Sequence, residues 1–480
     1  MLSLFQLGIF LLWLLVTTVT CVFGLNFALL AWINLRKEKL VNKRKVSDWP
    51  MVSIHIPVYN EANVVERTLK ACLDLDYPKD RLEVIIVDDS TDKTTSILKR
   101  YERQSSPKVK VIHRNSREGF KAGALNRAMK ESKGEFFFVL DADTVPRRSF
   151  LKEAIPHLYS DEKIAFVQGK LGNVNRESSW LTKSFSLIYD WYRVFVQSAL
   201  YKGGLPVCSV GSAVIYRRKA LESVGGWNSD TLTEDLDMSY KLRMNGWKGA
   251  FVLEAVCEDE APVFYSTFLD QYERHLKGPI QNLKKYGRAI IRSRNMTLFQ
   301  KMEALLILSN PISLPLGLLS IVLGILSYLV LPVEFVCRFW VSIFGYTFSA
   351  FCFVSFVSMP IGYFLMAREE SRLKFFVYLA GVGLILGDHL LVGTKAILDL
   401  LFRKSTSFTR TQKLGSISRR SFRSLRRNLS KGRKRAIGIR LLASIVLLFS
   451  FLVLSEKGLL LYSLGFLFPA VSWIASIFFY

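Results

Sequence analysis

The chain has 480 residues, of which 50% are apolar, and its 65 Lys and Arg against 40 Asp and Glu give a net charge of +25. This length is enough for two to four domains. The apolar residues gather in long runs near the two ends, which is typical of a membrane protein and argues against a purely soluble one. The six cysteines form no CxxC pair and no metal-ligand cluster, so we expect them to be reduced and structural.

Residues 1–35 are predicted to form a transmembrane helix. The run from Leu2 to Ile33 holds no Asp, Glu, Lys or Arg, and it exceeds the roughly 20 residues that cross a bilayer. Because no basic segment precedes it and no clear cleavage site follows it, we expect a retained anchor. Six basic residues lie between Arg36 and Lys45. By the positive-inside rule, the next domain is predicted to lie in the cytoplasm.

Residues 46–300 alternate between strand and helix patterns, which predicts an α/β domain with a mostly parallel sheet flanked by helices. Expected strands cover 51–58, 83–87, 109–113 and 135–140, and expected helices cover 66–74, 96–103, 119–130 and 236–245. Acidic residues follow three of these strands: Glu61, then Asp88 and Asp89, then Asp141 and Asp143. Ligands of open α/β sheets bind outside the carboxyl ends of the strands. We therefore expect one ligand site at this edge.

The segment Asp141-Ala142-Asp143 is the most informative part of the domain. It follows the apolar strand Phe136–Leu140, and its i, i+2 spacing places both carboxylates on one side. Hard oxygen ligands suit Mg²⁺ or Mn²⁺, which bind through one or two carboxylates together with substrate phosphates. A lone Asp-x-Asp is more often a solvated turn, but here it accompanies other acidic strand ends. No GxGxxG or Walker lysine motif is present, and Lys121 is a candidate for binding phosphate.

The C-terminal third is predicted to return to the membrane. Residues 303–402 hold two expected crossings, 305–331 and 339–366, and a 13-residue uncharged run, 375–387, that is too short to span and is expected to be interfacial. Residues 403–440 carry fourteen Lys and Arg and no acid, which favours a cytoplasmic loop near anionic lipid over a nucleic-acid arm. Residues 441–480 hold two more expected crossings. The prediction is a multi-pass cell-membrane protein with a cytoplasmic catalytic domain.

Six ordered motifs carry a resemblance to a known family. They are Pro57-Val58-Tyr59-Asn60-Glu61, Val87-Asp88-Asp89-Ser90-Thr91-Asp92, Lys121-Ala122-Gly123-Ala124-Leu125-Asn126, Asp141-Ala142-Asp143, Thr233-Glu234-Asp235 and Gln271-Tyr272-Glu273-Arg274. In this order the chain resembles the inverting GT-A (family 2) glycosyltransferases of the cellulose and mannan (glucomannan) synthase superfamily. The resemblance covers residues 50–300 strongly. It extends weakly through Phe408–Lys413, which resembles the gating loop of that superfamily.

The resemblance implies transfer of a hexose, with inversion, from a nucleotide diphosphate sugar of the UDP-glucose or GDP-mannose type. It implies a general base, Asp235, and a divalent cation (Mg²⁺ or Mn²⁺) on Asp143 and Asp141. The implied nucleotide-sugar residues are Pro57, Tyr59, Glu61, Asp88, Lys121, Asp141, Gln271 and Arg274. The implied acceptor residues are Gln168, Gly211, Ser212, Glu234 and His275, and the implied gating-loop residues are Phe408, Thr411 and Lys413. Arg274 is also implied in catalysis, as a cation for the leaving diphosphate.

One departure keeps the product open. Processive members of the superfamily carry Trp where this chain has His275, and imidazole offers a sugar ring less apolar area than indole. One hypothesis is therefore a synthase that extends a β-glycan, and another is a single-transfer enzyme acting on a membrane lipid. A third, a non-catalytic scaffold, is disfavoured by intact Asp141, Asp143 and Asp235. The base of the nucleotide, the linkage and the oligomeric state stay open, and no nucleic-acid partner is expected.

Overall fold

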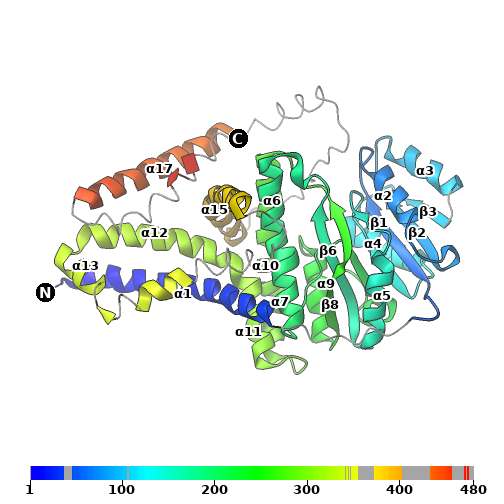
Figure 1. Ribbon diagram of the computed structural model, residues 1–480, viewed down its shortest axis with the longest axis horizontal. Coiled ribbons are helices and arrows are strands. Elements are labelled where there is room, and N and C mark those ends of the chain that lie inside the picture. Colours follow the sequence, from blue (N-terminus) through cyan, green and yellow to red (C-terminus); the bar gives the residue numbers. More distant parts are fainter. Residues whose placement is uncertain are drawn as a thin grey trace.

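The computed structural model describes residues 2–36, 46–104, 108–340, 342–343, 345, 347–354, 372–402, 433–456, 470–471 and 473–474. The predicted gating-loop residues Phe408, Thr411 and Lys413 lie outside the described residues, as do most of the predicted basic loop and the last predicted crossing. The described part consists of an α/β domain beside a group of long apolar helices (Figure 1).

The domain is built on one eight-stranded sheet in the order β3-β2-β1-β4-β7-β6-β8-β5. β1, β2, β3 and β4 run parallel, as do β6 and β8, whereas β7 is antiparallel to both β4 and β6. The mostly parallel sheet is thus confirmed, and each expected strand is found to within one residue at either end. The strands are β1 Val52–Val58, β2 Leu82–Asp88, β3 Lys108–His113, β4 Phe136–Val139, β5 Val145–Pro146, β6 Ile164–Asn173, β7 Val214–Arg217 and β8 Lys248–Asp259.

Helices cover both faces of this sheet, as the apolar β4 requires. Phe136 and Phe138 face one buried cluster with α2 and α5, while Phe137 and Val139 face a second cluster with α4, α7 and α9. The helices are α2 Val65–Leu73, α3 Thr94–Gln104, α4 Phe120–Glu131, α5 Phe150–Ser160, α6 Trp180–Asp190, α7 Gln197–Lys202, α8 Arg218–Ser223, α9 Glu234–Met244 and α10 Tyr265–Arg292. A π-helical turn, Trp191–Val196, joins α6 to α7.

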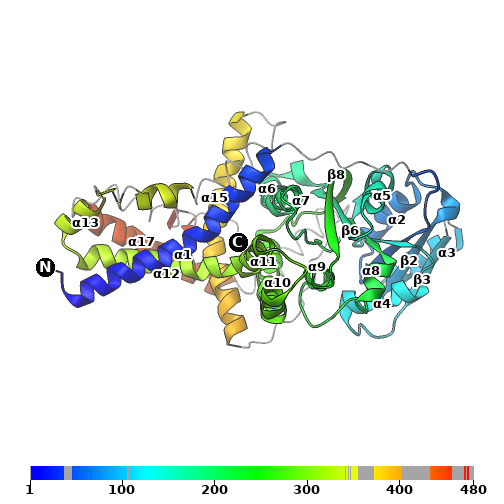
Figure 2. The same ribbon diagram turned by 90° about the horizontal axis from the view of Figure 1, so that it is seen from below.

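Two helical segments of the described residues, Leu4–Leu35 and Leu298–Val330, are long and apolar enough to cross a membrane. The first is α1, and the second consists of α11 Leu298–Ser309, a 3-10 turn Asn310–Ile312 and α12 Ser313–Val330. α1 and α12 lie side by side (Figures 1 and 2) and are linked by a 2.6 Å hydrogen bond between Thr17 and Ser320. The short helix α13 Val333–Trp340 follows.

The remaining helices correct two boundaries predicted from charge. The expected interfacial segment 375–387 is part of a 30-residue helix, α15 Arg372–Leu401, which lies crosswise to α1 and α12 (Figures 1 and 2). The segment predicted from the uncharged run is shorter than α15, because Asp388, which ends that run, is itself a buried residue of the helix. α17 spans Arg433–Glu456, so the last residues of the predicted basic loop are helical, and its apolar stretch is Ile437–Val453.

The end of α1 packs directly against the α/β domain. Leu30 and Ile33 belong to the same buried cluster as Phe137 of β4. Asn34 adds a 2.9 Å hydrogen bond from its side chain to the carbonyl of Phe195. The sheet domain is therefore held against the apolar helix that precedes it.

Candidate active site

The candidate site lies at the carboxyl ends of the parallel strands. β2, β1 and β4 are neighbours in register, so the residues that follow Val58, Asp88 and Val139 emerge along one edge of the sheet. This is the edge at which open α/β sheets bind ligands. The predicted common edge for the three acidic strand ends is present.

Lys121 of α4 lies between residues of three other motifs. Its ammonium is 2.6 Å from Asp141 and 3.2 Å from Glu234, and it donates a 2.9 Å hydrogen bond to the carbonyl of Gly211. Burial alone would lower the pKa of Lys121, but the carboxylates of Asp141 and Glu234 outweigh it and raise the pKa above its ordinary value. Lys121 thus stays cationic at the centre of an acidic group.

Asp235 lies in the first turn of α9 and faces the same centre. A Cβ added to Gly211 would lie 3.0 Å from its carboxylate and 3.3 Å from the Lys121 ammonium, so only a glycine leaves this space open. Burial, reinforced by the charge of Glu234 and opposed by Lys121, raises the pKa of Asp235 to about 7. A carboxyl whose pKa lies near the working pH is suited to general-base catalysis.

Asp141 and Asp143 follow β4 at different depths. The Asp141 side chain is 42% exposed, whereas Asp143 is 6% exposed and accepts a 3.2 Å hydrogen bond from the backbone amide of Glu260. Burial raises the pKa of Asp141, an effect that Lys121 opposes and Asp143 reinforces. Within the described ranges no three His, Cys, Asp or Glu residues are grouped closely enough to hold a metal. Two carboxylates completed by substrate phosphates are, however, a common way of binding Mg²⁺, and this pair fits it.

Asp88 lies at the end of β2 and is fully buried. Its carboxylate accepts hydrogen bonds from the amide of Ser90 at 3.0 Å and the hydroxyl of Thr95 at 2.6 Å, and it lies 3.0 Å from Nδ1 of His113. Asp88 therefore holds the loop after β2 against β3. Its predicted contact with the nucleotide stays a prediction.

The other nucleotide candidates follow β1. The guanidinium of Arg117 lies 3.5 Å from the ring centre of Tyr59, a cation–π contact. Pro57 is within β1, and the carbonyl of Glu61 accepts hydrogen bonds from the amides that lead into α2. Asp89 binds Arg114 through two hydrogen bonds of 2.7 and 2.6 Å, so this ion pair joins the loop after β2 to the residue that follows β3.

Arg114 and Arg117 were not predicted from the sequence. Both follow β3, the strand beside β2, and the same rule about strand ends could have found them. Basic residues that balance the acidic strand ends thus follow the neighbouring strand.

Gln168 of β6 supports the loop that carries Gly211 and Ser212. Its amide nitrogen donates to the carbonyls of Ser212 and Ala213 at 3.0 and 3.1 Å, and its oxygen accepts from the amide of Val210 at 3.0 Å. Gln168 is fully buried and supports this loop, and its implied contact with the acceptor stays a prediction. Ser212 is also buried and accepts a 2.9 Å hydrogen bond from the amide of Asp141.

The candidates on α10 come from the Gln271–His275 segment. Gln271 accepts a 2.7 Å hydrogen bond from the hydroxyl of Tyr189, which α6 supplies. Burial raises the pKa of Asp235, and the positive charge of Arg274 partly opposes this rise, so the two residues lie near each other. Burial, followed by the charges of Arg274 and Arg193, lowers the pKa of His275 to about 3. His275 is therefore a neutral imidazole near Arg274.

The match to a protein family agrees with this geometry. Residues 53–225, which include Tyr59, Asp88, Lys121, Asp141 and Gly211, match the sequence model of the family described as Glycosyl transferase family 2. The chain carries a glycosyl transferase family 2 domain. The resemblance stated from the six motifs is confirmed.

Curated relatives of the family 2 domain are plant glucomannan mannosyltransferases. The chain is 31% identical over 261 residues to probable glucomannan 4-beta-mannosyltransferase 7 of Oryza sativa subsp. japonica, and 31% identical over 262 residues to glucomannan 4-beta-mannosyltransferase 7 of Arabidopsis thaliana. Each match covers 53% of this chain, and 45% and 47% of the two relatives. The chain thus spans about half the length of the curated relatives it matches.

A solved structure supports the fold. Mannosyltransferase PcManGT from Pyrobaculum calidifontis, determined in complex with GDP-Man and Mn²⁺, aligns with 75% of this chain and 99% of its own, with a TM-score of 0.54 and 22% identity. At that identity the likeness concerns the fold. The family 2 domain has the GT-A type of α/β fold that the motifs predicted.

Proposed function

We propose that this chain transfers mannosyl groups from GDP-mannose to a growing β-1,4-linked mannan or glucomannan. The observation that carries the proposal is the meeting of Lys121, Asp141, Glu234 and Asp235 around Gly211 at the carboxyl edge of the sheet. The choice of donor and product is supported by the glucomannan mannosyltransferases that share about half of this chain.

The residues have separate parts in an inverting displacement. The acceptor hydroxyl attacks the anomeric carbon, the bond from that carbon to the diphosphate oxygen breaks, and the hydroxyl proton passes to Asp235. The raised pKa of Asp235 suits this transfer, because a carboxylate that titrates near 7 is a stronger base than an ordinary one. Glu234 contributes by raising that pKa.

Cationic side chains stabilise the departing nucleoside diphosphate. Lys121 is cationic and lies 2.6 Å from Asp141, and Arg274 lies close enough to Asp235 to affect its titration. Asp141 and Asp143 would hold a divalent cation, Mg²⁺ or Mn²⁺, whose charge offsets the charge growing on the diphosphate. The planar donors of Arg274 suit a phosphate group.

The apolar helices support a membrane location for this chemistry. α1 and the α11–α12 segment are long and apolar enough to cross a bilayer, and α1 packs on the sheet domain through Leu30 and Ile33. In our proposal the sheet domain faces the cytoplasm, where nucleotide sugars are the donors, and the chain is a multi-pass protein. Membrane lipid would then surround α1 and α12.

The test is a donor panel with the full chain in detergent. Labelled GDP-mannose and UDP-glucose are supplied in turn with Mn²⁺, and the product is separated into polymer and solvent-extractable lipid. A polymer made from GDP-mannose and digested by an endo-β-1,4-mannanase is expected, and Asp235→Asn should abolish it. Incorporation of label from UDP-glucose alone would overturn the assignment of GDP-mannose as the donor. A short lipid-linked product would establish the single-transfer alternative.

A further inference from the structure

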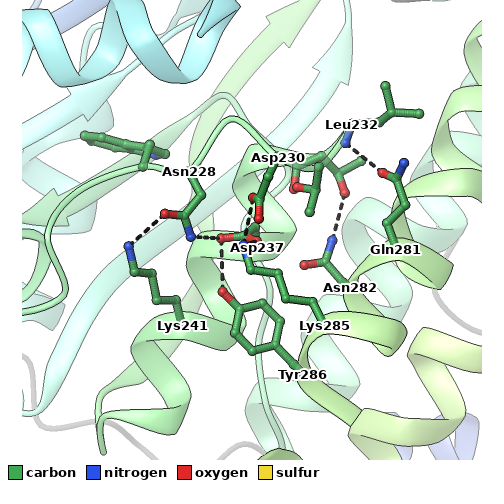
Figure 3. A network of polar contacts seen from close by, with 12 residues as sticks. Asn228, Asp230, Leu232, Asp237, Lys241, Gln281, Asn282, Lys285 and Tyr286 are labelled. Atoms are coloured by element: carbon green, nitrogen blue, oxygen red, sulfur yellow. Dashed lines mark hydrogen bonds and ion pairs between the residues drawn. The ribbon is translucent and has the colours of Figure 1, made fainter. Parts of the chain in front are cut away.

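Of the three carboxylates in the first turn of α9, those of Asp235 and Asp237 face opposite ways. Asp235 and Asp237 are two positions apart, which is about 200° around an α-helix. The carboxylate of Asp235 lies near Gly211. The carboxylate of Asp237 faces Lys285 and Tyr286 of α10 (Figure 3). A shift of Asp237 therefore turns the same short segment that holds Asp235.

Asp237 is fully buried and well satisfied. One of its oxygens accepts hydrogen bonds from Asn228 at 2.8 Å and from the hydroxyl of Tyr286 at 3.1 Å. The other is 2.5 Å from the ammonium of Lys285, which also pairs with the exposed Asp230 at 2.8 Å. A buried carboxylate is tolerated only with such partners, so the start of α9 is bound to Lys285 and Tyr286 of α10 in a single arrangement.

The loop leading into α9 is bound to the same helix. The amide of Leu232 donates a 2.9 Å hydrogen bond to Gln281, and Asn282 donates a 3.2 Å bond to the hydroxyl of Thr233 (Figure 3). A Cβ added to Gly278 would lie within 2.3 Å of the Thr233 side chain, so α10 and this loop touch closely. Thr233 is the N-cap of α9 but makes no capping hydrogen bond with its side chain. Contacts with α10 thus hold the segment that leads into α9.

We infer that Asp237, through Lys285 and Tyr286, is a positioning residue that fixes the place of Asp235 relative to Arg274. α10 carries Arg274 in its N-terminal half and these partners in its C-terminal half, so one continuous helix, with Pro279 between the two halves, is the reference for both groups. The inference rests on the proposed function, in which Asp235 is the base. Asp237 itself touches no reacting atom.

An ordinary structural ion pair would behave differently. Loss of such a pair lowers stability but leaves the turnover of the folded fraction unchanged. A displaced base, in contrast, lowers kcat while KM for the donor is retained, because the groups proposed to bind the donor lie outside α9. Lys121 does pair with Glu234 of the first turn, but Asp141 and the carbonyl of Gly211 also hold its ammonium. A misplacement of about 1 Å costs roughly 10²-fold in rate.

The experiment compares Asp237→Asn with the full-length parent protein. Initial rates are measured with GDP-mannose and Mn²⁺, and hydrogen–deuterium exchange is followed in peptides that cover residues 229–236. We expect kcat to fall by about 10²-fold with KM for the donor retained, and exchange at 229–236 to quicken while β1 and β4 keep their protection. Lys285→Met should act in the same way, and Lys285→Arg should restore much of kcat by keeping the charge.

Two variants make the test specific. Asp230→Asn removes the exposed partner of Lys285 and should leave kcat unchanged. Tyr286→Phe removes one hydroxyl only, and it provides a milder variant if Asp237→Asn fails to fold. A parent-like kcat in folded Asp237→Asn, or unchanged exchange at 229–236, would overturn the inference. A parent protein inactive with every donor would instead overturn the proposed function, and the exchange measurement would still decide whether Asp237 fixes this segment.

Discussion

Arg440 of α17 binds Asp388 of α15 through two hydrogen bonds, of 2.7 and 2.6 Å, and both side chains are almost completely buried. Asp388 also accepts a 2.9 Å hydrogen bond from the hydroxyl of Tyr265, at the start of α10. Three helices that are far apart in the sequence therefore meet at one carboxylate. α10 is also the helix that carries Gln271 and Arg274.

Breaking this ion pair should destabilise the protein strongly. Arg440→Met leaves the carboxylate of Asp388 buried without its cation, and we expect the free energy of unfolding to fall by about 3–5 kcal/mol. Denaturant titration of the protein in detergent measures it. Lys395→Met is the control, because Lys395 is 61% exposed where it pairs with Glu273 and exposed pairs contribute only about 0–1 kcal/mol. An equal fall in the free energy of unfolding in Arg440→Met and Lys395→Met would contradict this account.

Gly211→Ala should lower activity more than stability. Gly211 has φ of +84°, and an added Cβ would crowd Asp235 and Lys121. Gly204, with φ of +63°, has nothing within 4 Å of its added Cβ, so Gly204→Ala carries the backbone strain without the crowding. Both variants should lose stability to a similar extent, about 1–2 kcal/mol. Only Gly211→Ala should lose turnover, by about tenfold or more. A similar loss of turnover in Gly204→Ala would refute the proposed crowding of Asp235 and Lys121.

The pH dependence of kcat should show an acid limb near pH 7. Asp235 accepts a proton only in its ionised form, and burial raises its pKa to about 7. The rate should therefore rise as pH increases through 7 and then level off. Glu234→Gln removes a charge that raises this pKa, so its acid limb should move to lower pH. A parent limb centred near pH 4 would show that Asp235 is not the titrating base.

Asp143→Ala should abolish turnover that depends on a divalent cation. If the cation offsets charge on the leaving diphosphate, its loss should cost about 10²-fold or more in kcat. Rates measured across a Mn²⁺ titration provide the readout. Asp161→Asn, which removes a surface partner of Lys248, should leave the titration curve as in the parent protein. A cation response preserved in Asp143→Ala would place the cation elsewhere.

Much of the domain could be predicted because its signals are local. The strand before Asp141 is an unbroken apolar run, and burial on both faces of the sheet is what that run requires. The spacing of Asp141 and Asp143 and the order of the motifs gave the edge of the sheet and its chemistry. The strand and the Asp141–Asp143 spacing depend on residues close together in the sequence, and each motif is itself only three to six residues long.

What could not be predicted depends on contacts across the fold. The resemblance implied Gln168 only as an acceptor residue and did not show that the loop after Cys208 binds both ends of its amide. The predicted length of α15 was too short because the charge of Asp388 indicated the end of an apolar segment. Its buried partner, Arg440, lies 52 positions away in the sequence. The support of α9 by Lys285 and Tyr286 is equally invisible in a linear pattern.

The packing of α1 has a practical consequence for anyone who trims the chain to obtain a soluble enzyme. A version that starts at residue 46 would lack Leu30 and Ile33, and the apolar side chains of α7 and the π-helical turn that share their buried cluster would be exposed to solvent. Such a fragment is expected to aggregate during purification, whereas one that retains the end of α1 is expected to keep its interior closed.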